Sequence, residues 1–282
     1  MNKILVTGAT GFIGNYVVSA LLKNGCQVIA SSMDENKAKQ CSWFSAVTYI
    51  PFDISLFNDE INYYEFFYKP GAMIHLAWEG LPNYKAGFHV EVNLPRHYSF
   101  LKNMLQNGLA NLTVTGTCFE YGMQEGMLSE NMSSHPANPY ALAKDNLRKL
   151  LEEQSEKMPF VFKWVRLFYM YGSGQNPKSL FSQLQKAIDE KADTFNMSGG
   201  EQVRDYLKVA QVAEYIVMIA LQDTVTGIIN CCSGKPVSIK QLVEKYLQEQ
   251  QVEMNLNLGY YPYTDYEPMA FWGDAKKLKS IN

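Results

Sequence analysis

The sequence predicts an α/β fold: a doubly wound parallel sheet that carries a smaller α+β substrate-binding cap. Short apolar runs alternate with segments of helical length over roughly the first 168 of its 282 residues, a rhythm typical of parallel sheets with helices on both faces. A glycine-rich turn follows the first apolar run directly. In such sheets, loops at the carboxyl ends of the strands bind ligands.

Seven apolar runs are expected to be strands, in the order KILVTG, CQVIAS, VTYIPFD, AMIHLAW, NLTVTGT, FVFKWVRLF and GIINCC. Helices are expected over Phe12–Lys23 and over about 86–106, 140–156 and 209–221. The alternation breaks in two aromatic-rich stretches. We therefore expect one domain from 1–168 plus about 205–232, and a cap from about 169–204 plus 233–282.

Composition excludes several classes of protein. A net charge of −3 disfavours a general nucleic-acid or membrane surface, and no apolar run reaches the roughly 18 residues of a membrane span. The start of the chain does not have the pattern of a secretory signal. Five cysteines without a CxxC pair suit a reducing compartment and offer no zinc site. A cytoplasmic protein without a metal is expected.

The turn Gly8-Ala9-Thr10-Gly11-Phe12-Ile13-Gly14 lies between the first strand and the first helix. Glycine allows the tight turn, the approach of backbone to a pyrophosphate, and close packing of helix on strand. The N–H groups at the start of the helix would face the phosphates. Gly8, Thr10, Gly11, Phe12, Ile13 and Gly14 are thus expected to bind a dinucleotide.

The end of the second strand bears on the choice between NAD and NADP. An acid there would bind the ribose 2′-hydroxyl and repel a 2′-phosphate. The chain has Ser31 and Ser32 at this point with Lys37 nearby, although Asp34 and Glu35 blur the pattern. NADP(H) is favoured and NAD(H) remains possible.

Other cofactor contacts are expected at further strand ends. Asp53, followed by Ile54, either accepts a hydrogen bond from adenine or caps a helix. Leu76 and Ala77 would let the cofactor lie close to the fourth strand. His75 is expected to be a satisfied strand residue, not a catalyst.

A catalytic set is expected where NLTVTGT meets the helix that PYALAK opens. Tyr140 and Lys144 are four residues apart and share one helix face. A phenol titrates near pH 10, so a neighbouring ammonium would help it exchange protons. Thr117 or Thr115 supplies the third group, a hydroxyl at the strand end.

The sequences GATGFIG, YALAK, VRLFYMYG and GGEQVRDYLKVAQVAEYI together resemble the extended short-chain dehydrogenase/reductases, the NAD-dependent epimerase/dehydratase family. The resemblance implies a Rossmann-type domain, with hydride moving between nicotinamide and a sugar carbon. It implies that Thr117 orients the carbonyl oxygen, Tyr140 is the general acid/base and Lys144 tunes it. Thr115 would then lie beside the cofactor, and Asn93 would support the cofactor site. A homodimer through a four-helix interface of segments 86–106 and 140–156 is also implied.

Departures from the family's motifs indicate which of the family's reactions to expect. Dehydratases carry an acid pair after the threonine, where this chain has Cys118 and Phe119. Epimerases usually have an asparagine where Tyr169 follows Arg-x-Phe. HLAW-x-GLPNY with GTCFEYG instead resembles bacterial reductases that form dTDP-fucose from dTDP-4-dehydro-6-deoxyglucose. This implies NAD(P)H-dependent reduction of the C4 ketone of a nucleotide-activated deoxysugar, for polysaccharide assembly.

The substrate would be a nucleotide-diphosphate deoxysugar. The expected contacts are Trp78 and Asn83 in the loop over the site, Thr117, Tyr169 and Ser179, and Arg204 for the diphosphate. Glu120 is expected either to touch the sugar or to buttress the loop. Two alternatives stay open: a C4 epimerase with tightly bound NAD and, more distantly, a non-catalytic redox sensor.

Overall fold

A computed structural model describes residues 3–281 and contains a parallel sheet of seven strands. The strands are β1 (Lys3–Thr7), β2 (Gln27–Ser32), β3 (Thr48–Pro51), β4 (Ala72–His75), β5 (Asn111–Thr117), β7 (Val161–Leu167) and β12 (Gly227–Cys231). Their order in the sheet is β12-β7-β5-β4-β1-β2-β3. Six strands lie within their predicted runs and β2 extends one residue past its run, to Ser32, so the predicted fold class is confirmed.

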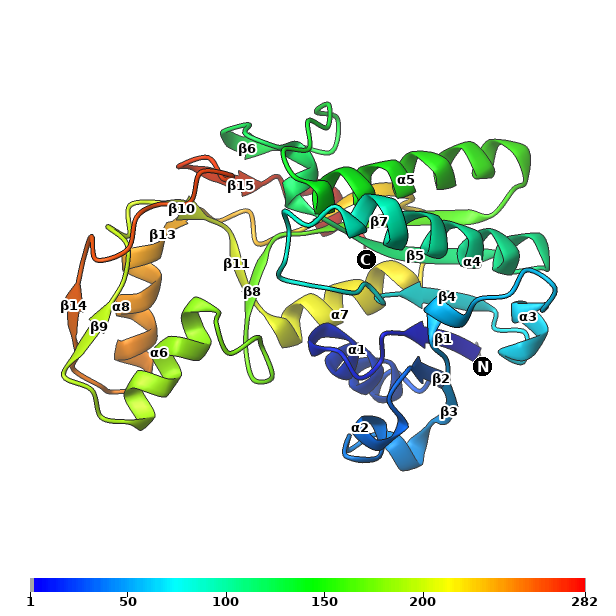
Figure 1. Cartoon of the computed structure of the whole chain (residues 1–282), viewed down its shortest axis with the longest axis horizontal. Coiled ribbons are helices and arrows are strands. Elements are labelled where there is room, and N and C mark those ends of the chain that lie inside the picture. The colour runs from blue at the N-terminus through cyan, green and yellow to red at the C-terminus, as the bar shows by residue number, and fades with distance from the viewer. Residues whose placement is uncertain (1–2, 282) are drawn as a thin grey trace.

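Helices cover both faces of this sheet (Figure 1). α1 (Phe12–Lys23) and α7 (Val209–Ala220) lie on one face, and α4 (Leu94–Gln106) and α5 (Pro139–Lys157) lie side by side on the other. β1 supplies both cores, because Ile4 and Val6 pack toward α1 and α7 while Leu5 packs toward α4 and α5. A strand buried on both faces reads as an unbroken apolar run, as seen in KILV.

The segment expected to be helical over about 86–106 is helical from His89 to Gln106, and only its first turn is irregular. A single π-helical turn at His89–Asn93 precedes α4. Pro95, near the start of α4, has no N–H for a hydrogen bond one turn back, so the helix restarts there. Two short helices, α2 (Glu35–Lys39) and α3 (Tyr63–Phe66), complete this part of the chain.

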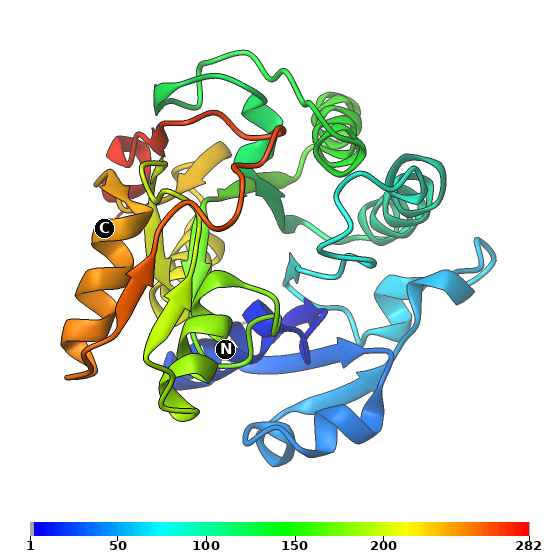
Figure 2. The same cartoon turned by 60° about the vertical axis from the view of Figure 1, so that its left-hand side comes forward.

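The cap combines two helices with short strand pairs (Figure 2). α6 (Leu180–Asp189) and α8 (Ile239–Glu249) share a separate apolar core that includes Leu184 and Val243. Within the cap, β9 (Thr194–Asn196) pairs with β14 (Asn255–Asn257) and β10 (Val203–Arg204) with β13 (Val237–Ser238). Two more pairs join the cap segments to the rest of the chain: β8 (Tyr169–Tyr171) with β11 (Tyr206–Lys208), and β15 (Phe271–Gly273) with β6 (Gly126–Leu128). α9 (Lys276–Lys279) ends the described chain.

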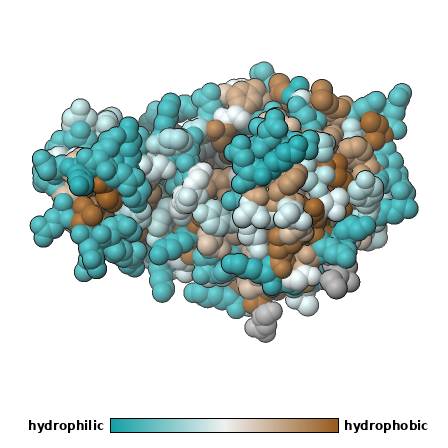
Figure 3. All heavy atoms as spheres, turned by 90° about the horizontal axis from the view of Figure 1, so that it is seen from below, coloured by the Kyte–Doolittle hydropathy of each residue, from teal (hydrophilic) through white to brown (hydrophobic). Residues whose placement is uncertain are grey.

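The surface seen from below mixes polar and apolar side chains, and the cap end is mainly hydrophilic there (Figure 3). Within residues 3–281, every helix is too short or too polar to cross a bilayer.

Parallel register brings the carboxyl ends of the strands to one edge of the sheet. Thr7 pairs with Ser31 on one side and with His75 on the other, and Thr117 pairs with Leu167. The glycine turn, the end of β2 and the end of β5 therefore meet at this edge, facing the cap.

Candidate active site

The glycine turn joins β1 to α1 at this edge. Gly8 has a φ of 69°, and a Cβ there would lie 2.8 Å from the backbone nitrogen of Ala77. A Cβ on Gly14 would collide with the carbonyl oxygen of Gly8. Only glycine fits at both positions. Gly11 precedes α1 and makes no side-chain cap, so the first N–H groups of the helix are free for an anion.

Two adjoining cavities of about 240 Å³ and 420 Å³ share this turn. Gly8, Gly11, Leu76 and Trp78 line both. The smaller cavity is also lined by Thr10, Ser31, Ser32, Lys37, Asp53, Ile54 and Ala77, and the larger by Phe12, Ile13, Gly14, Thr117 and Tyr140. A groove with a backbone cradle and an open helix start fits a dinucleotide. Of the residues predicted to touch the cofactor, Asn93, Thr115 and Lys144 line neither cavity.

The β2 end presents hydroxyls and an exposed ammonium to the smaller cavity. The Ser32 hydroxyl lies 2.9 Å from the Tyr49 hydroxyl. Asp34, the first acid after β2 in the chain, accepts a hydrogen bond from the Lys37 backbone and caps α2. The Lys37 ammonium forms no ion pair with any residue between 3 and 281.

Asp53 is a cap in this structure. Its carboxylate accepts a hydrogen bond of 2.8 Å from the Ser55 backbone and begins the short turn Ile54–Leu56. Asp53 also lines the smaller cavity. The capping alternative is thus observed, and contact with adenine stays a prediction.

Thr117 and Tyr140 meet at the larger cavity. Thr117 ends β5, and Tyr140 is the second residue of α5. Asn138 caps that helix by accepting from the Ala141 backbone, and the Tyr140 backbone donates to the Tyr84 carbonyl at 3.1 Å. Burial raises the pKa of the Tyr140 phenol above its ordinary value, and a hydrogen bond with Thr117 offsets only part of that rise. The phenol therefore remains protonated and available as an acid.

Lys144 lies one helical turn further along, behind the cavity wall. Its ammonium donates to the Thr115 carbonyl at 2.9 Å and lies 4.1 Å from the centre of the Trp78 ring. Burial lowers the pKa of this ammonium to about 7. The predicted tuning of Tyr140 is not visible as a direct contact, because Lys144 instead binds Thr115 and Trp78.

Two buried histidines support the Trp78 side of the site. His75 lies 2.8 Å from the Thr7 hydroxyl through Nδ1 and 2.8 Å from His97 through Nε2, and burial lowers its pKa to about 3. The Trp78 ring stacks on His97 with centroids 4.6 Å apart. The interpretation of His75 as a satisfied strand residue is confirmed. The sequence pattern did not single out His97.

A third cavity of about 490 Å³ lies in the cap and meets the 420 Å³ cavity. We call the residues that line both the junction: Pro82, Tyr84, Phe119, Tyr169, Met170, Gln175 and Asn176. None of the seven is charged. Phe119 packs edge-on against Tyr84, with centroids 5.2 Å apart, and also contacts Tyr169. The junction therefore connects the cavity that Thr117 and Tyr140 line to the cavity in the cap.

Glu120 is not placed to bind a substrate, so its inclusion among the substrate contacts is corrected. Its carboxylate is fully buried and accepts hydrogen bonds from the Thr117 backbone, the Trp164 ring and Arg166. With Thr117 it forms a reciprocal cap on the turn Cys118–Tyr121. The buttressing alternative is the one observed.

Arg204 also binds other residues of the chain. Its guanidinium is 2% exposed, pairs with Glu267 at 2.9 Å and donates to the Met269 carbonyl. Its centre lies 4.5 Å from the middle of the Phe271 ring. Arg204 and Glu267 both line the cap cavity. Binding of a diphosphate by Arg204 would require this ion pair to open.

Some of the remaining predicted site residues line the cavities, and others lie in or beside the loop after β4. Ser179 lines the cap cavity and caps α6, and Tyr169 lies in the junction. Asn83 is exposed and lines none of the three cavities. Asn93 donates to the Glu79 carbonyl at 3.1 Å and so holds the loop after β4. Sequence reasoning missed Gln175, Asn176 and Tyr266, because they follow no pattern and meet the site only through folding.

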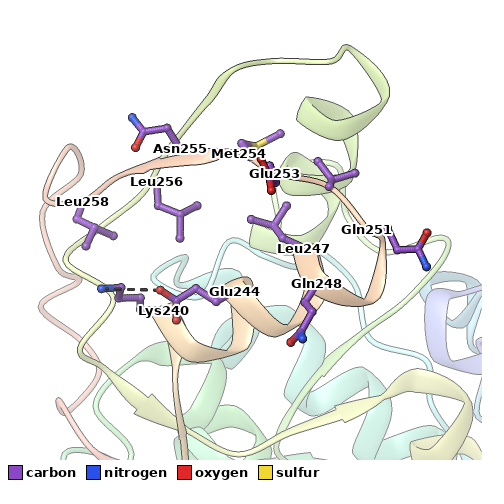
Figure 4. A pocket seen from close by; sticks show the side chains of 11 residues that line it. Lys240, Glu244, Leu247, Gln248, Gln251, Glu253, Met254, Asn255, Leu256 and Leu258 are labelled. Carbon is purple, nitrogen blue, oxygen red and sulfur yellow. Dashed lines mark ion pairs between the residues drawn. The ribbon is translucent and has the colours of Figure 1, made fainter.

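An open hollow of about 730 Å³ lies on the outside of the cap, away from every predicted site residue (Figure 4). Leu247, Met254 and Leu256 line it, and the Lys240–Glu244 ion pair lies at its edge. Volume alone does not make it the site, since it contains no group aligned for catalysis. In residues 3–281 no cluster of three His, Cys, Asp or Glu side chains could hold a metal ion.

Residues 4–232 match the family model described as NAD dependent epimerase/dehydratase family. A protein of Aggregatibacter actinomycetemcomitans named dTDP-6-deoxy-L-talose 4-dehydrogenase (NAD(+)) is 32% identical over 272 residues, covering 96% of this chain and 99% of that protein. The chain belongs to the NAD-dependent epimerase/dehydratase family. The family prediction is confirmed, and with it the prediction of a nicotinamide-dependent enzyme.

A second relative and a solved structure are similar to nearly the whole chain. A GDP-6-deoxy-D-talose 4-dehydrogenase of the same bacterium is 26% identical over 290 residues, 99% of this chain and 90% of that protein. The structure of a Bacillus cereus UDP-glucuronic acid 4-epimerase with UDP-glucuronic acid and NAD superposes with a TM-score of 0.84 at 23% identity. It covers 99% of this chain and 92% of that one, and at this identity it shows the fold alone.

Proposed function

We propose that this protein transfers hydride reversibly between NAD(P)(H) and C4 of a nucleotide-activated 6-deoxyhexose, and that it works as a 4-ketoreductase. One observation carries the proposal: Thr117 and Tyr140 share a cavity with the glycine turn, and an uncharged aromatic junction joins that cavity to the cap. Oxidation of a C4 hydroxyl, the reaction in the names of both deoxytalose relatives, is the reverse of C4 ketone reduction.

Each residue of the site has a separate role in the proposed reaction. When bound, the dinucleotide supplies hydride to the carbonyl carbon, and the Gly8–Gly14 turn with the start of α1 would hold its pyrophosphate. Thr117 orients the carbonyl oxygen. Tyr140, whose pKa burial raises, gives its proton to the oxygen as the alcohol forms. Lys144 supports the site through Thr115 and Trp78.

The same residues argue against dehydration. Cys118 is buried and burial raises the pKa of its thiol, while Phe119 offers only a ring. Neither can act as the acid or base that water elimination needs. The buried carboxylate of Glu120 already binds three donors.

The two parts of the chain divide the binding in this proposal. Residues 1–168 with about 205–232 hold the dinucleotide, and about 169–204 with 233–282 hold the nucleotide of the substrate. The cap cavity of about 490 Å³ is the proposed nucleotide site. The expected location in the cytoplasm is part of the same proposal.

The proposed cofactor is NADP(H), with NAD(H) as the alternative. The support is the exposed Lys37 ammonium beside Ser31 and Ser32, with Asp34 turned to its own helix. Against it, the named relatives and neighbours specify NAD. Lys37→Met should weaken NADPH binding about 10-fold, the effect of one charge-assisted hydrogen bond, and leave NADH binding unchanged. Lys39→Met, which removes a lysine paired with Glu35, is the control in the same titration.

The deciding assay mixes the protein with NADPH or NADH and a panel of nucleotide-linked 4-keto-6-deoxyhexoses. We expect one mole of cofactor oxidised per mole of sugar reduced, and NMR of the product gives its configuration at C4. The fucose configuration follows from the sequence resemblance, and the talose configuration from the relatives' names.

The second candidate is C4 epimerisation with tightly held NAD, since several relatives are named 4-epimerases. Interconversion of UDP-hexoses without net change in the cofactor would establish it. Tyr169 stands where epimerases of the family usually have an asparagine, which favours the reductase.

A further inference from the structure

The junction contains two buried polar atoms without a hydrogen-bond partner among residues 3–281, the Tyr169 hydroxyl and the side-chain oxygen of Gln175, Oε1. A hydroxyl can rotate to donate or accept, whereas the Gln175 oxygen can only accept. A buried acceptor without a donor costs free energy, so native structures rarely leave one unless a ligand or water completes it.

The orientation of this amide is set by the chain. The Gln175 amide nitrogen donates to the Met170 carbonyl at 2.9 Å. Turning the amide over would place two oxygens against each other and break that bond, because a carbonyl oxygen can only accept. The Gln175 backbone also donates to the Gly172 carbonyl. Oε1 is therefore held as an acceptor at a fixed place.

The surroundings restrict what can donate to it. Gln175 lines both the catalytic cavity and the cap cavity, as do the rings of Phe119 and Tyr169. The junction offers no cation, so a sugar acid would leave its carboxylate unpaired there. A neutral ring with an apolar face and a hydroxyl donor fits these walls.

We propose that Gln175 is a specificity-determining residue whose Oε1 accepts a hydrogen bond from the C2 or C3 hydroxyl of the nucleotide-linked sugar. This inference rests on the proposed function, since the C4 oxygen is assigned to Thr117 and Tyr140. It adds a substrate contact that the sequence did not reveal, and it assigns the junction to the sugar ring.

The test is a cycle of enzyme and substrate variants in the oxidising direction, with NAD(P)+. Wild-type protein and Gln175→Leu are each assayed with the nucleotide-linked 6-deoxyhexose that the panel selects, and with its 2-deoxy and 3-deoxy analogues. Wild-type kcat/KM should fall about 10- to 100-fold for one of the two analogues, since that analogue leaves a buried acceptor unpaired. Gln175→Leu should lose a similar factor with the parent sugar and lose the discrimination against that analogue.

Ratios of kcat/KM within one preparation do not depend on the fraction of folded protein, so partial misfolding of the variant does not blur the result. Gln250→Leu, an exposed position at the end of α8, should behave as wild type. Equal losses on the parent sugar and both analogues, or no loss at all, would overturn the role of Gln175.

Failure of the proposed function is a separate outcome. If wild-type protein oxidises none of the 6-deoxy sugars but epimerises a UDP-hexose, the reductase proposal is wrong. The same cycle with 2-deoxy and 3-deoxy forms of that UDP-hexose then decides on Gln175 by the same criterion.

Discussion

Burial shifts the pKa values of the two side chains to which we assign the proton chemistry, Tyr140 and Lys144. It raises the pKa of the Tyr140 phenol and lowers that of the Lys144 ammonium to about 7, in each case because the charged form loses its hydration. Near neutral pH the phenol is thus a competent acid, and the lysine is close to the midpoint of its titration. This pair favours proton donation to a developing alcohol.

Tyr140→Phe tests the acid. The variant keeps the ring and loses only the hydroxyl, so ketone reduction should slow about 100- to 10,000-fold. NAD(P)H affinity, measured by fluorescence titration, should stay the same. Undiminished turnover would remove Tyr140 from the mechanism.

Lys144 should couple stability to pH in the protein without cofactor. Its pKa is about 7 when folded and has its ordinary value of 10.5 when unfolded. Between these values the unfolded chain binds more protons, so this lysine makes stability rise with pH. The free energy of unfolding of wild type minus that of Lys144→Met should increase from pH 7 to pH 9, by at most about 1.4 kcal/mol per pH unit. Urea titrations at several pH values measure it, and a flat difference contradicts the buried ammonium.

At the scale of elements, the site depends on the turn that follows β5. Glu120 reaches back to the Thr117 backbone and bonds the Trp164 ring and Arg166 of β7. β5 and β7 are neighbours in the sheet. The carboxylate thus links the end of β5, where Thr117 lies, to the adjacent strand.

Glu120→Gln should destabilise the protein by about 3 kcal/mol, since it leaves the Arg166 charge buried without its partner. Urea unfolding measures the loss, and turnover should fall too because Thr117 loses its support. Glu153→Gln, which breaks only the exposed pair with Lys157, serves as the comparison and should leave unfolding unchanged. Equal stability of the two variants would show that Glu120 does not hold the turn.

In the whole molecule, the edge of the sheet formed by the carboxyl ends of its strands faces a cap with its own core, and α4 and α5 lie side by side on one face of the sheet (Figure 2). The predicted homodimer would pair these two helices with their copies in a second chain. Leu142 on α5 is 40% exposed, as expected for an apolar residue that a partner would cover.

Leu142→Glu should convert a dimer into a monomer in sedimentation velocity runs, because the carboxylate would be buried in the interface without a partner. Leu221→Glu is a matched change at the end of α7, on the opposite face, where the residue is 42% exposed. It should leave the assembly unchanged. A wild-type monomer at the concentrations used in the assays would refute the prediction.

Much of the fold could be predicted because its signals are local. The seven runs, the glycine turn and Phe12–Lys23 depend on apolar periodicity and on residues that permit only certain backbone shapes. The helix expected over about 86–106 is present from His89 to Gln106, but the sequence did not show that its first turn is π-helical. The cap helices α6 and α8 had no predicted bounds, because their apolar faces pair with short strands from distant parts of the chain.

The sheet, the glycine turn and the proximity of Thr117 to Tyr140 could be predicted because each depends on a few residues close together in the chain. Other features became visible only in the folded chain. Folding turned Glu120 into a buttress, paired Arg204 with Glu267 across 63 residues, and left Gln175 with a free acceptor in the junction. The physical reason is that the partners of a polar side chain are chosen by folding, and sequence spacing does not show which groups burial will bring together.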